Sequence, residues 1–404
     1  MDYSFNRYSA FIAYQDVPFT YAIRHIGLAL KGNKLGFDVI DRIAHLVMGI
    51  IEFIPFIGML AAFGEKIALC RRSIKHIKLE KTDPYERGRE HGEKLKNEIS
   101  SVYAIVLNLK KTGYYTNKAK EFEKNIPQEL KEELRGLANG SGQQYEDVLL
   151  IHTFLDASPG SFGCSVMARK YGSDSEEQRI AAANHSVQRE QQDYVSESAS
   201  RRNKLLRGVL KRPHQSEKLL LESNKRDTIQ SIVFDLNARE IKLSANGSWA
   251  AERTFRKFTY EELFEGNSEK LGNSDHSHLI RNLDWPWPFL GQNTIVLSRK
   301  SQSGISSVNV TFPGYIGTLS GMNERGVALS QASNGYSKNT NGIPNTLFFT
   351  HLLDHSRTVE EAITTLERFE HGSSVNVIIA DPTEAKSLEL IGTRNQIKIV
   401  GEIK

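Results

Sequence analysis

The first half of the chain shows a helical spacing of apolar positions. Apolar residues recur every three or four positions from 84 to 111, opposite a dense charged face, and predict an amphipathic helix. The same pattern predicts helices over Ala119–Leu137 and Tyr145–Ala157. The run Ser158–Gly163 follows, and its proline and glycines are typical of a turn that ends a helix. Residues 81–163 are therefore expected to form a helical segment.

Short apolar runs characterise the second half and predict β-strands. Ile229–Leu236 and Glu240–Ala245 flank three turn residues, which predicts a β-hairpin. Two helices interrupt the strands, near Pro344–His355 and over Thr358–Phe369, the latter with a capping box on Thr358. Strands covered by helices, without a regular βαβ alternation, favour an α+β fold over a parallel Rossmann sheet. The further strands predicted are Thr294–Ser298, Ile305–Phe312, Val327–Ala332, Val375–Ala380, Ser387–Ile391 and Gln396–Val400.

An apolar run of eighteen residues with a single charge, Leu46–Phe63, stands near the N-terminus. Its length is at the lower limit for crossing a bilayer, and Glu52 and Pro55 near its middle disfavour one spanning helix. Two short helices are expected instead, either buried as a hairpin or lying on a membrane surface. Basic residues follow up to position 75 and would face anionic lipid, so residues 46–75 are a candidate peripheral membrane contact.

Composition narrows the class of protein. A length of 404 residues predicts two or three structural units, here 1–80 as a helical extension, 81–163, and 164–404. A net charge of +4 gives no electrostatic reason to expect nucleic acid, and 39% apolar residues exclude a disordered chain. The chain starts without the basic-then-apolar order of a secretory signal, so a cytoplasmic or membrane-peripheral location is expected. The polar stretch 190–226 is typical of a mobile insert or linker.

Of the two cysteines, Cys164 is the candidate nucleophile. Two cysteines cannot build a disulfide framework, which leaves a reducing compartment or a reactive thiol. Cys70 lies inside an apolar periodic segment, as an ordinary buried thiol does. Cys164 instead follows Gly163 directly, at the end of a turn and the start of a strand-like run.

Polar residues at strand ends offer further candidates. Arg281 and Asp284, three apart in RNLDWPW, can point at one centre from a strand end, or form a structural ion pair under Trp285 and Trp287. Asn376 starts an apolar strand and should be buried, where its amide must be hydrogen-bonded either to the protein or to a substrate oxygen. A third cluster is the segment 313–326, whose recurring glycines are typical of β-turns.

These motifs together resemble a known family. Gly163-Cys164, RNLDWPW, FPGYIGTLSGMNERGVALS, GIPNTLFFTHLLDHSRTVEEA and SSVNVIIADP are similar to the acyl-coenzyme A:6-aminopenicillanate acyltransferase-like peptidases. These are N-terminal-nucleophile hydrolases, distantly related to acid ceramidase and choloylglycine hydrolase. The segment PYERGREHGEKLK is also similar, so the resemblance covers roughly residues 80–400. It implies a four-layer αββα sandwich over 164–404, with the helices of 84–156 packed outside it.

The resemblance also implies a mechanism. The chain would be a zymogen that cleaves its own Gly163–Cys164 bond, and the new α-amino group would take the thiol proton. Cys164 would then attack an amide or acyl thioester, a small and lipid-like molecule, and form an acyl-enzyme that water or an amine resolves. No cofactor and no metal are implied. The implied roles are charge stabilisation of the thiolate by Arg281, orientation of the amine by Asp284, and oxyanion donation by Asn376 with Asn334 or Ser333. Beside the arginine motif, the apolar Trp285 and Trp287 indicate either contact with an apolar acyl group or a place in the core.

One departure from the family keeps alternatives open. Arg281 lies 117 residues after Cys164, whereas the family places its arginine motif a strand or two after the cysteine. The intervening block 172–278 resembles the family's usual C-terminal segment, here found upstream, which indicates a permuted order. A conventional cysteine–histidine pair with His152, His185 or His351 as base is one alternative. A catalytically inactive, membrane-docked binding or scaffold protein on the same fold is the other.

Overall fold

The computed structural model divides the chain into two compact units, Met1–Ser73 and Ile74–Lys404. All the residues that it describes lie in the second unit, so the predictions for the apolar run Leu46–Phe63 fall outside them. No helix within the described ranges is long and apolar enough to cross a membrane. The described residues are 74–107, 113–157, 164–171, 177–183, 216–224, 228–265, 271, 276–285, 288–339, 341–392 and 396–403.

Among the described residues, the part of the chain before Cys164 contains five helices: α3 (Pro84–Lys94), α4 (Lys96–Val106), α5 (Tyr114–Glu123), α6 (Gln128–Ser141) and α7 (Tyr145–Ala157). The prediction of α7 is confirmed. The single helices predicted over 84–111 and 119–137 are wrong, because each is two helices. Leu95 has non-helical backbone angles between α3 and α4. Pro127 stands just before α6, where a proline is tolerated, whereas it would disrupt the interior of a continuous helix.

The larger sheet has eight strands in the order β1-β8-β9-β10-β11-β12-β13-β14. All neighbours are antiparallel except β1 (Lys75–Leu79), which pairs in parallel with β8. The prediction of a helical extension up to residue 80 is therefore wrong for Lys75–Leu79, which form a strand. The predicted helices between β11 and β12 are confirmed as α12 (Asn345–His355) and α13 (Val359–Glu367). The other strands are β8 (Ile295–Lys300), β9 (Ser306–Thr311), β10 (Ser320–Asn323), β11 (Ala328–Lys338), β12 (Ser373–Ala380), β13 (Ala385–Ile391) and β14 (Gln396–Ile403).

The second sheet has six antiparallel strands in the order β3-β2-β7-β4-β5-β6. The predicted hairpin is confirmed as β4 and β5. Part of the predicted polar linker 190–226 is instead a helix, α9 (Ser216–Glu222), because Leu219 and Leu220 give it a buried apolar face. The strands are β2 (Cys164–Tyr171), β3 (Glu177–Ala183), β4 (Thr228–Asp235), β5 (Glu240–Ala245), β6 (Arg256–Phe258) and β7 (His276–Asp284), with short helices α10 (Tyr260–Leu263) and α11 (Pro288–Gln292) and a 3₁₀ turn at Ala250–Glu252.

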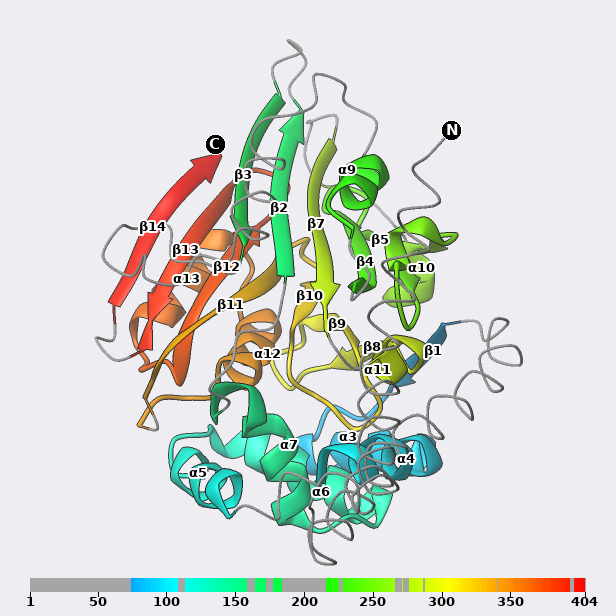
Figure 1. Cartoon of the computed structure of the whole chain (residues 1–404), viewed down its shortest axis with the longest axis vertical. Helices are drawn as coiled ribbons and strands as arrows, with labels where there is room; N and C mark the ends of the chain where they lie inside the picture. Colours follow the sequence, from blue (N-terminus) through cyan, green and yellow to red (C-terminus); the bar gives the residue numbers. More distant parts are fainter. Residues whose placement is uncertain are drawn as a thin grey trace, which may run out of the picture. The chain divides into compact units, whose positions relative to one another are not determined.

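The two sheets face each other, with β2 and β3 against β11 and β12. Because side chains alternate along a strand, each sheet contributes one row to the shared core and one row to an outer face. Helices α12 and α13 cover the outer face of the larger sheet, and α9 covers that of the smaller sheet. Helices α3 to α7 gather at one end of both sheets (Figure 1). The prediction of an α+β fold is confirmed.

Helices α3 and α6 approach each other unusually closely through two pairs of glycines, four residues apart on each helix. A Cβ atom at Gly88 would lie 1.9 Å from the carbonyl oxygen of Glu133, and one at Gly136 would lie 1.9 Å from that of Tyr85. Any larger residue at these positions would push the helix backbones apart. This contact fixes the position of α6, whose buried Glu133 joins the helices to β8.

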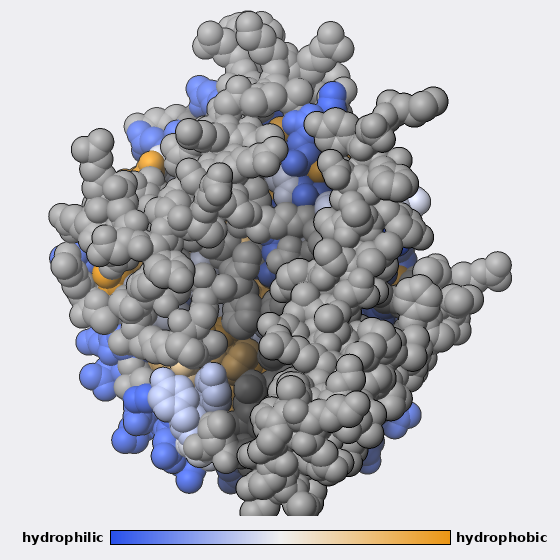
Figure 2. Space-filling model, in the orientation of Figure 1, coloured by the Kyte–Doolittle hydropathy of each residue, from blue (hydrophilic) through white to orange (hydrophobic). Residues whose placement is uncertain are grey.

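Where described residues are visible in Figure 2, those at the edges of the face are mostly hydrophilic, and a smaller apolar area is visible near the lower centre. Few large apolar side chains are exposed among the described residues, and they are scattered: Tyr85, Tyr114, Leu221, Phe369 and Ile399. Scattered apolar residues are normal for a folded protein and do not indicate an interaction surface.

Candidate active site

Cys164 is the first residue of β2 and is almost completely buried. Strand β2 lies between β3 and β7 and pairs Cys164 with Leu283 and Val166 with Arg281 (Figure 1). This register brings Arg281 beside the thiol, although the two residues are 117 positions apart, and its Nη2 donates to Sγ over 3.1 Å.

The guanidinium of Arg281 is held rigidly across the two sheets. Its Nη1 donates to the carbonyl oxygen of Leu319 over 2.9 Å and to Oγ of Ser320 on β10 over 2.7 Å. Arg281 is 1% exposed, and no carboxylate of the described residues lies within ion-pair distance of it. A buried cation needs an anionic partner to offset its lost hydration. A thiolate at Cys164, or negative charge developing on a bound substrate, would be such a partner.

Cys164 and Arg281 lie in the wall of a cavity with an empty volume of about 450 Å³, part of it open to solvent. Residues from α7, β2, β7, β11, α12 and β12 enclose it, so both sheets and the helical segment contribute. The wall consists of Leu155, Asp156, Cys164, Arg281, Leu283, Trp285, Leu319, Gln331, Ser333, Asn345, Thr346, Ser373 and Val375.

The other site residues predicted from the sequence differ in whether they line this cavity. Ser333 and Trp285 line the cavity. Asp284 and Asn376 are buried next to lining residues but do not line it themselves. Asp284 accepts a hydrogen bond from the hydroxyl of Thr228 over 2.6 Å, on the neighbouring strand β4. Trp287 and the side chain of Asn334 lie outside the described parts of the chain.

The histidine alternative finds no support in the described residues, none of whose histidines lines the cavity. His152 is a structural residue: its Nδ1 bonds the carbonyl oxygen of Val148, and its Nε2 accepts from the amide of Ile316. Burial lowers the pKa of His152 to about 4. His351 contacts Glu129 instead, and His185 lies outside the described ranges.

Sequence reasoning missed a carboxylate in the cavity wall, Asp156 at the end of α7. Its Oδ1 accepts from the amide of Asn345 over 3.1 Å and from the hydroxyl of Ser373 over 2.6 Å. Its Oδ2 is buried without a hydrogen-bond partner among the described residues. Burial raises the pKa of Asp156 to about 6, against the lowering effect of those two hydrogen bonds. The available signal was a carboxylate in the otherwise apolar end of α7, directly before the turn that precedes Cys164.

The raised pKa predicts that Asp156→Asn stabilises the protein at high pH. A carboxyl whose folded-state pKa lies above its ordinary 3.8 stabilises the fold below that value and loses this contribution as the pH rises through about 6. The asparagine variant should therefore gain up to about 3 kcal/mol in unfolding free energy at pH 8, and the gain should shrink as the pH falls from 6 towards 4. Urea unfolding across this range measures it. A gain independent of pH would show that the pKa of Asp156 is the same in the folded and the unfolded protein.

A second, wholly apolar cavity of about 430 Å³ adjoins the first. Leu155, Trp285 and Leu319 line both, so Trp285 stands at their boundary. The rest of its wall is Val102, Ile151, Phe154, Leu290, Phe312, Pro313 and Tyr315. A site that combines a polar centre with a neighbouring apolar chamber suits a molecule with a reactive carbonyl group and a hydrocarbon chain.

Two facing sheets with a buried cysteine–arginine pair between them define a mixed α/β protein with a thiol-centred site. Residues 271–404 match the model of the acyl-coenzyme A:6-aminopenicillanic acid acyl-transferase family. This confirms the family resemblance over that part of the chain, which contains Arg281 and most of the cavity wall but not Cys164. The match suggests an acyltransferase or hydrolase. No curated protein matches the chain.

Proposed function

We propose that this protein is a cysteine-nucleophile amide hydrolase or acyltransferase that forms an acyl-enzyme at Cys164. The observation that carries the proposal is the 3.1 Å contact between Nη2 of Arg281 and Sγ of Cys164, in the wall of a substrate-sized cavity. A thiolate is the nucleophilic form of cysteine, and an adjacent guanidinium stabilises its negative charge. The family match over 271–404 supports the same class of reaction.

We assign the fold to the αββα sandwich of the N-terminal-nucleophile hydrolases. Two features support the assignment. The facing sheets carry helices on both outer faces, and the candidate nucleophile is the first residue of a strand beside the shared core. The 6-stranded sheet accommodates the permuted order, because β2 pairs directly with β7 whatever length of chain connects them.

The catalytic base in this proposal is the α-amino group of Cys164, released by cleavage of the Gly163–Cys164 bond. The thiol attacks the carbonyl carbon of Gly163, the acyl group moves from nitrogen to sulfur, and water hydrolyses the resulting thioester. The free amine, with a pKa near ~8, then takes the thiol proton. The absence of a histidine from the described cavity wall favours this base over a cysteine–histidine pair. Asp284, one position beyond the residue paired with Cys164, would orient the amine.

Turnover follows from the same groups. The Cys164 thiolate attacks the substrate carbonyl, and the C–N or C–S bond breaks as the leaving group takes the proton held by the α-amino group. Water or an amine then attacks the acyl-enzyme and gives a proton back to the α-amino group, and the thioester C–S bond breaks to release the acyl product and restore the thiolate. Asn376 and either Ser333 or Asn334 would donate to the oxyanion. A single such donor contributes on the order of 3 kcal/mol to transition-state stabilisation in comparable sites.

The substrate is proposed to be a small N-acyl amide or acyl thioester with a lipid-like acyl group. The apolar cavity beside Trp285 would hold the acyl chain while its carbonyl carbon lies at Cys164. Membrane contact through residues 46–75 would bring the enzyme to such substrates.

Acyl-chain length tests this function. Among N-acyl amides and acyl thioesters from acetyl to palmitoyl, kcat/KM should rise by about threefold to fourfold per buried methylene until the chamber is filled. Trp285→Ala should lower kcat/KM for long acyl groups much more than for acetyl, whereas Tyr85→Ala, at an exposed site, should change neither. No turnover of any member would contradict the function, and an equal loss for all chain lengths would contradict the acyl chamber.

A further inference from the structure

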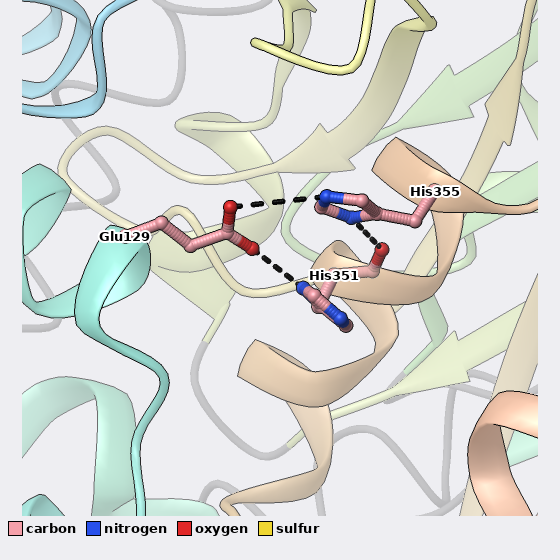
Figure 3. A group of neighbouring side chains, drawn as sticks. All are labelled: Glu129, His351 and His355. Carbon is pink, nitrogen blue, oxygen red and sulfur yellow. Dashed lines mark hydrogen bonds and ion pairs between the residues drawn. The ribbon is translucent and has the colours of Figure 1, made fainter.

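A cluster of three potential metal ligands lies between helices α6 and α12 (Figure 3), and none of the three lines the Cys164 cavity. Glu129 stands in the first turn of α6, and His351 and His355 are one turn apart on α12. Their ligand atoms all lie within 4.8 Å of one another. We propose that these residues form a binding site for a first-row transition-metal ion with a preference for Zn²⁺.

The hydrogen bonding of His355 prepares it for metal ligation. Its Nδ1 lies 2.9 Å from the main-chain carbonyl oxygen of His351, and because that oxygen only accepts, Nδ1 carries the proton in this contact. The lone pair of a neutral His355 is then on Nε2, which lies 3.8 Å from Oε2 of Glu129. A histidine ligand typically donates its other ring N–H to a backbone carbonyl in this way. Two electron-pair donors facing each other at this distance favour a cation between them.

His351 is held with its Nδ1 directed at the same carboxylate. Nδ1 lies 2.5 Å from Oε1 of Glu129, and the ring stacks on Phe348 and packs edge-on against Phe369. The aromatic contacts restrict rotation of the ring, so the nitrogen stays directed at Glu129 without a metal. Binding would replace the hydrogen-bonded proton by the ion, and that proton would leave to solvent.

The ligand set selects the class of ion. Tetrahedral zinc, with bonds of about 2.0–2.1 Å to nitrogen and oxygen, needs ligand atoms roughly 3.3 Å apart, between the two nitrogen–oxygen separations observed here. Two imidazoles and one carboxylate favour Zn²⁺, Ni²⁺ or Cu²⁺ over Mg²⁺ and Ca²⁺, which prefer oxygen ligands. The side chain of His355 is 35% exposed and that of Glu129 is 29% exposed, so an ion and a fourth, water ligand can enter from solvent.

A bound ion would link helix α6 to helix α12 through these ligands. α12 begins with Asn345 and Thr346, which line the Cys164 cavity, while His351 and His355 lie in its second half. None of the three proposed ligands lines that cavity, so the inference is independent of the chemistry proposed for Cys164. Glu129 is 222 residues from His351, so spacing along the chain does not show that the three residues meet.

Isothermal titration of the full, chelator-stripped chain with Zn²⁺ tests the proposal, with melting temperature as a second readout. His355→Ala and, separately, Glu129→Gln should each weaken zinc binding at one site by more than about 100-fold and remove the zinc-dependent rise in melting temperature. His278→Gln removes a histidine on β7 that pairs with Asp235 and is not one of the three proposed ligands, and it should leave both unchanged. Mg²⁺ should not compete.

Two results would overturn the proposal. One is wild-type protein that does not bind Zn²⁺. The other is binding that both His355→Ala and Glu129→Gln retain in full, which would place the ion elsewhere in the chain. Because His355 lies at the surface, its replacement should leave the fold intact, and the melting temperature of the metal-free variant checks this.

Discussion

Cys164→Ala is expected to lower turnover by about 10⁴-fold or more and to prevent any cleavage at Gly163–Cys164. The alanine variant keeps the strand β2 and the cavity but has no group that can attack a carbonyl carbon. Activity assays and the mass of the purified chain measure the two effects. Cys70→Ala removes the only other cysteine of the chain and should change neither.

Cys164→Ser separates the two chemical steps. Serine can still take part in an N-to-O acyl shift, so cleavage should persist or slow, while turnover should fall much further because a hydroxyl is the weaker nucleophile. Lys211→Ala, in the polar stretch 190–226, is the control for general damage. Equal losses of turnover in Cys164→Ser and Lys211→Ala would argue against a role for the thiol.

Glu133→Ala is expected to destabilise the fold by about 3–5 kcal/mol, because it removes the counter-charge of buried Arg87 and leaves buried Arg299 with Asp354 alone. Oε2 of Glu133 lies 2.7 Å from Nη2 of Arg87 on α3 and 2.6 Å from Nη2 of Arg299 on β8. Burial alone would raise the pKa of Glu133, but Arg299 and Arg87 together lower it below its usual value. This contribution to stability is therefore present at neutral pH and is lost as the pH falls through the lowered pKa.

Urea unfolding at neutral pH measures this effect. Glu93→Ala is the matched control, because Glu93 pairs with Arg89 on the exposed face of α3, and it should change the unfolding free energy by less than about 0.5 kcal/mol. Asp354, 3.0 Å from Arg299, remains as a partial counter-charge in the Glu133 variant. Similar small changes in both variants would show that the buried network does not hold α3, α6 and β8 together.

Local patterns in the sequence were sufficient for most strands and helices of the second half. The hairpin β4–β5, the helices α12 and α13, and the cap at Thr358 all depend on residues close together in the chain. Strand β1 was missed because its partner, β8, is more than 200 residues away and supplies the pairing. The break before α6 was not predicted, because a single helix was expected over 119–137 although Pro127 disrupts the interior of a helix.

The candidate site could be predicted only where a motif existed. Cys164 and Arg281 were predicted from their positions after a turn and at a strand end, and from the family resemblance, and strand pairing explains why they meet. Asp156 carries no motif, and it enters the cavity through contacts with Asn345 and Ser373, about 200 residues later. The metal ligands on α6 and α12 are separated in the same way. Contacts between distant segments depend on the tertiary fold, and spacing within one segment does not reveal them.

The most direct test of an acyl-enzyme at Cys164 is the intact mass of the full chain after brief incubation with a long-chain acyl thioester and acid quenching. The proposal predicts two fragments split at Gly163–Cys164, with the mass of the acyl group added to the fragment that begins at Cys164. The Cys164→Ala chain should remain whole and unmodified. An uncleaved wild-type chain without an adduct, or an adduct that persists in Cys164→Ala, would contradict it.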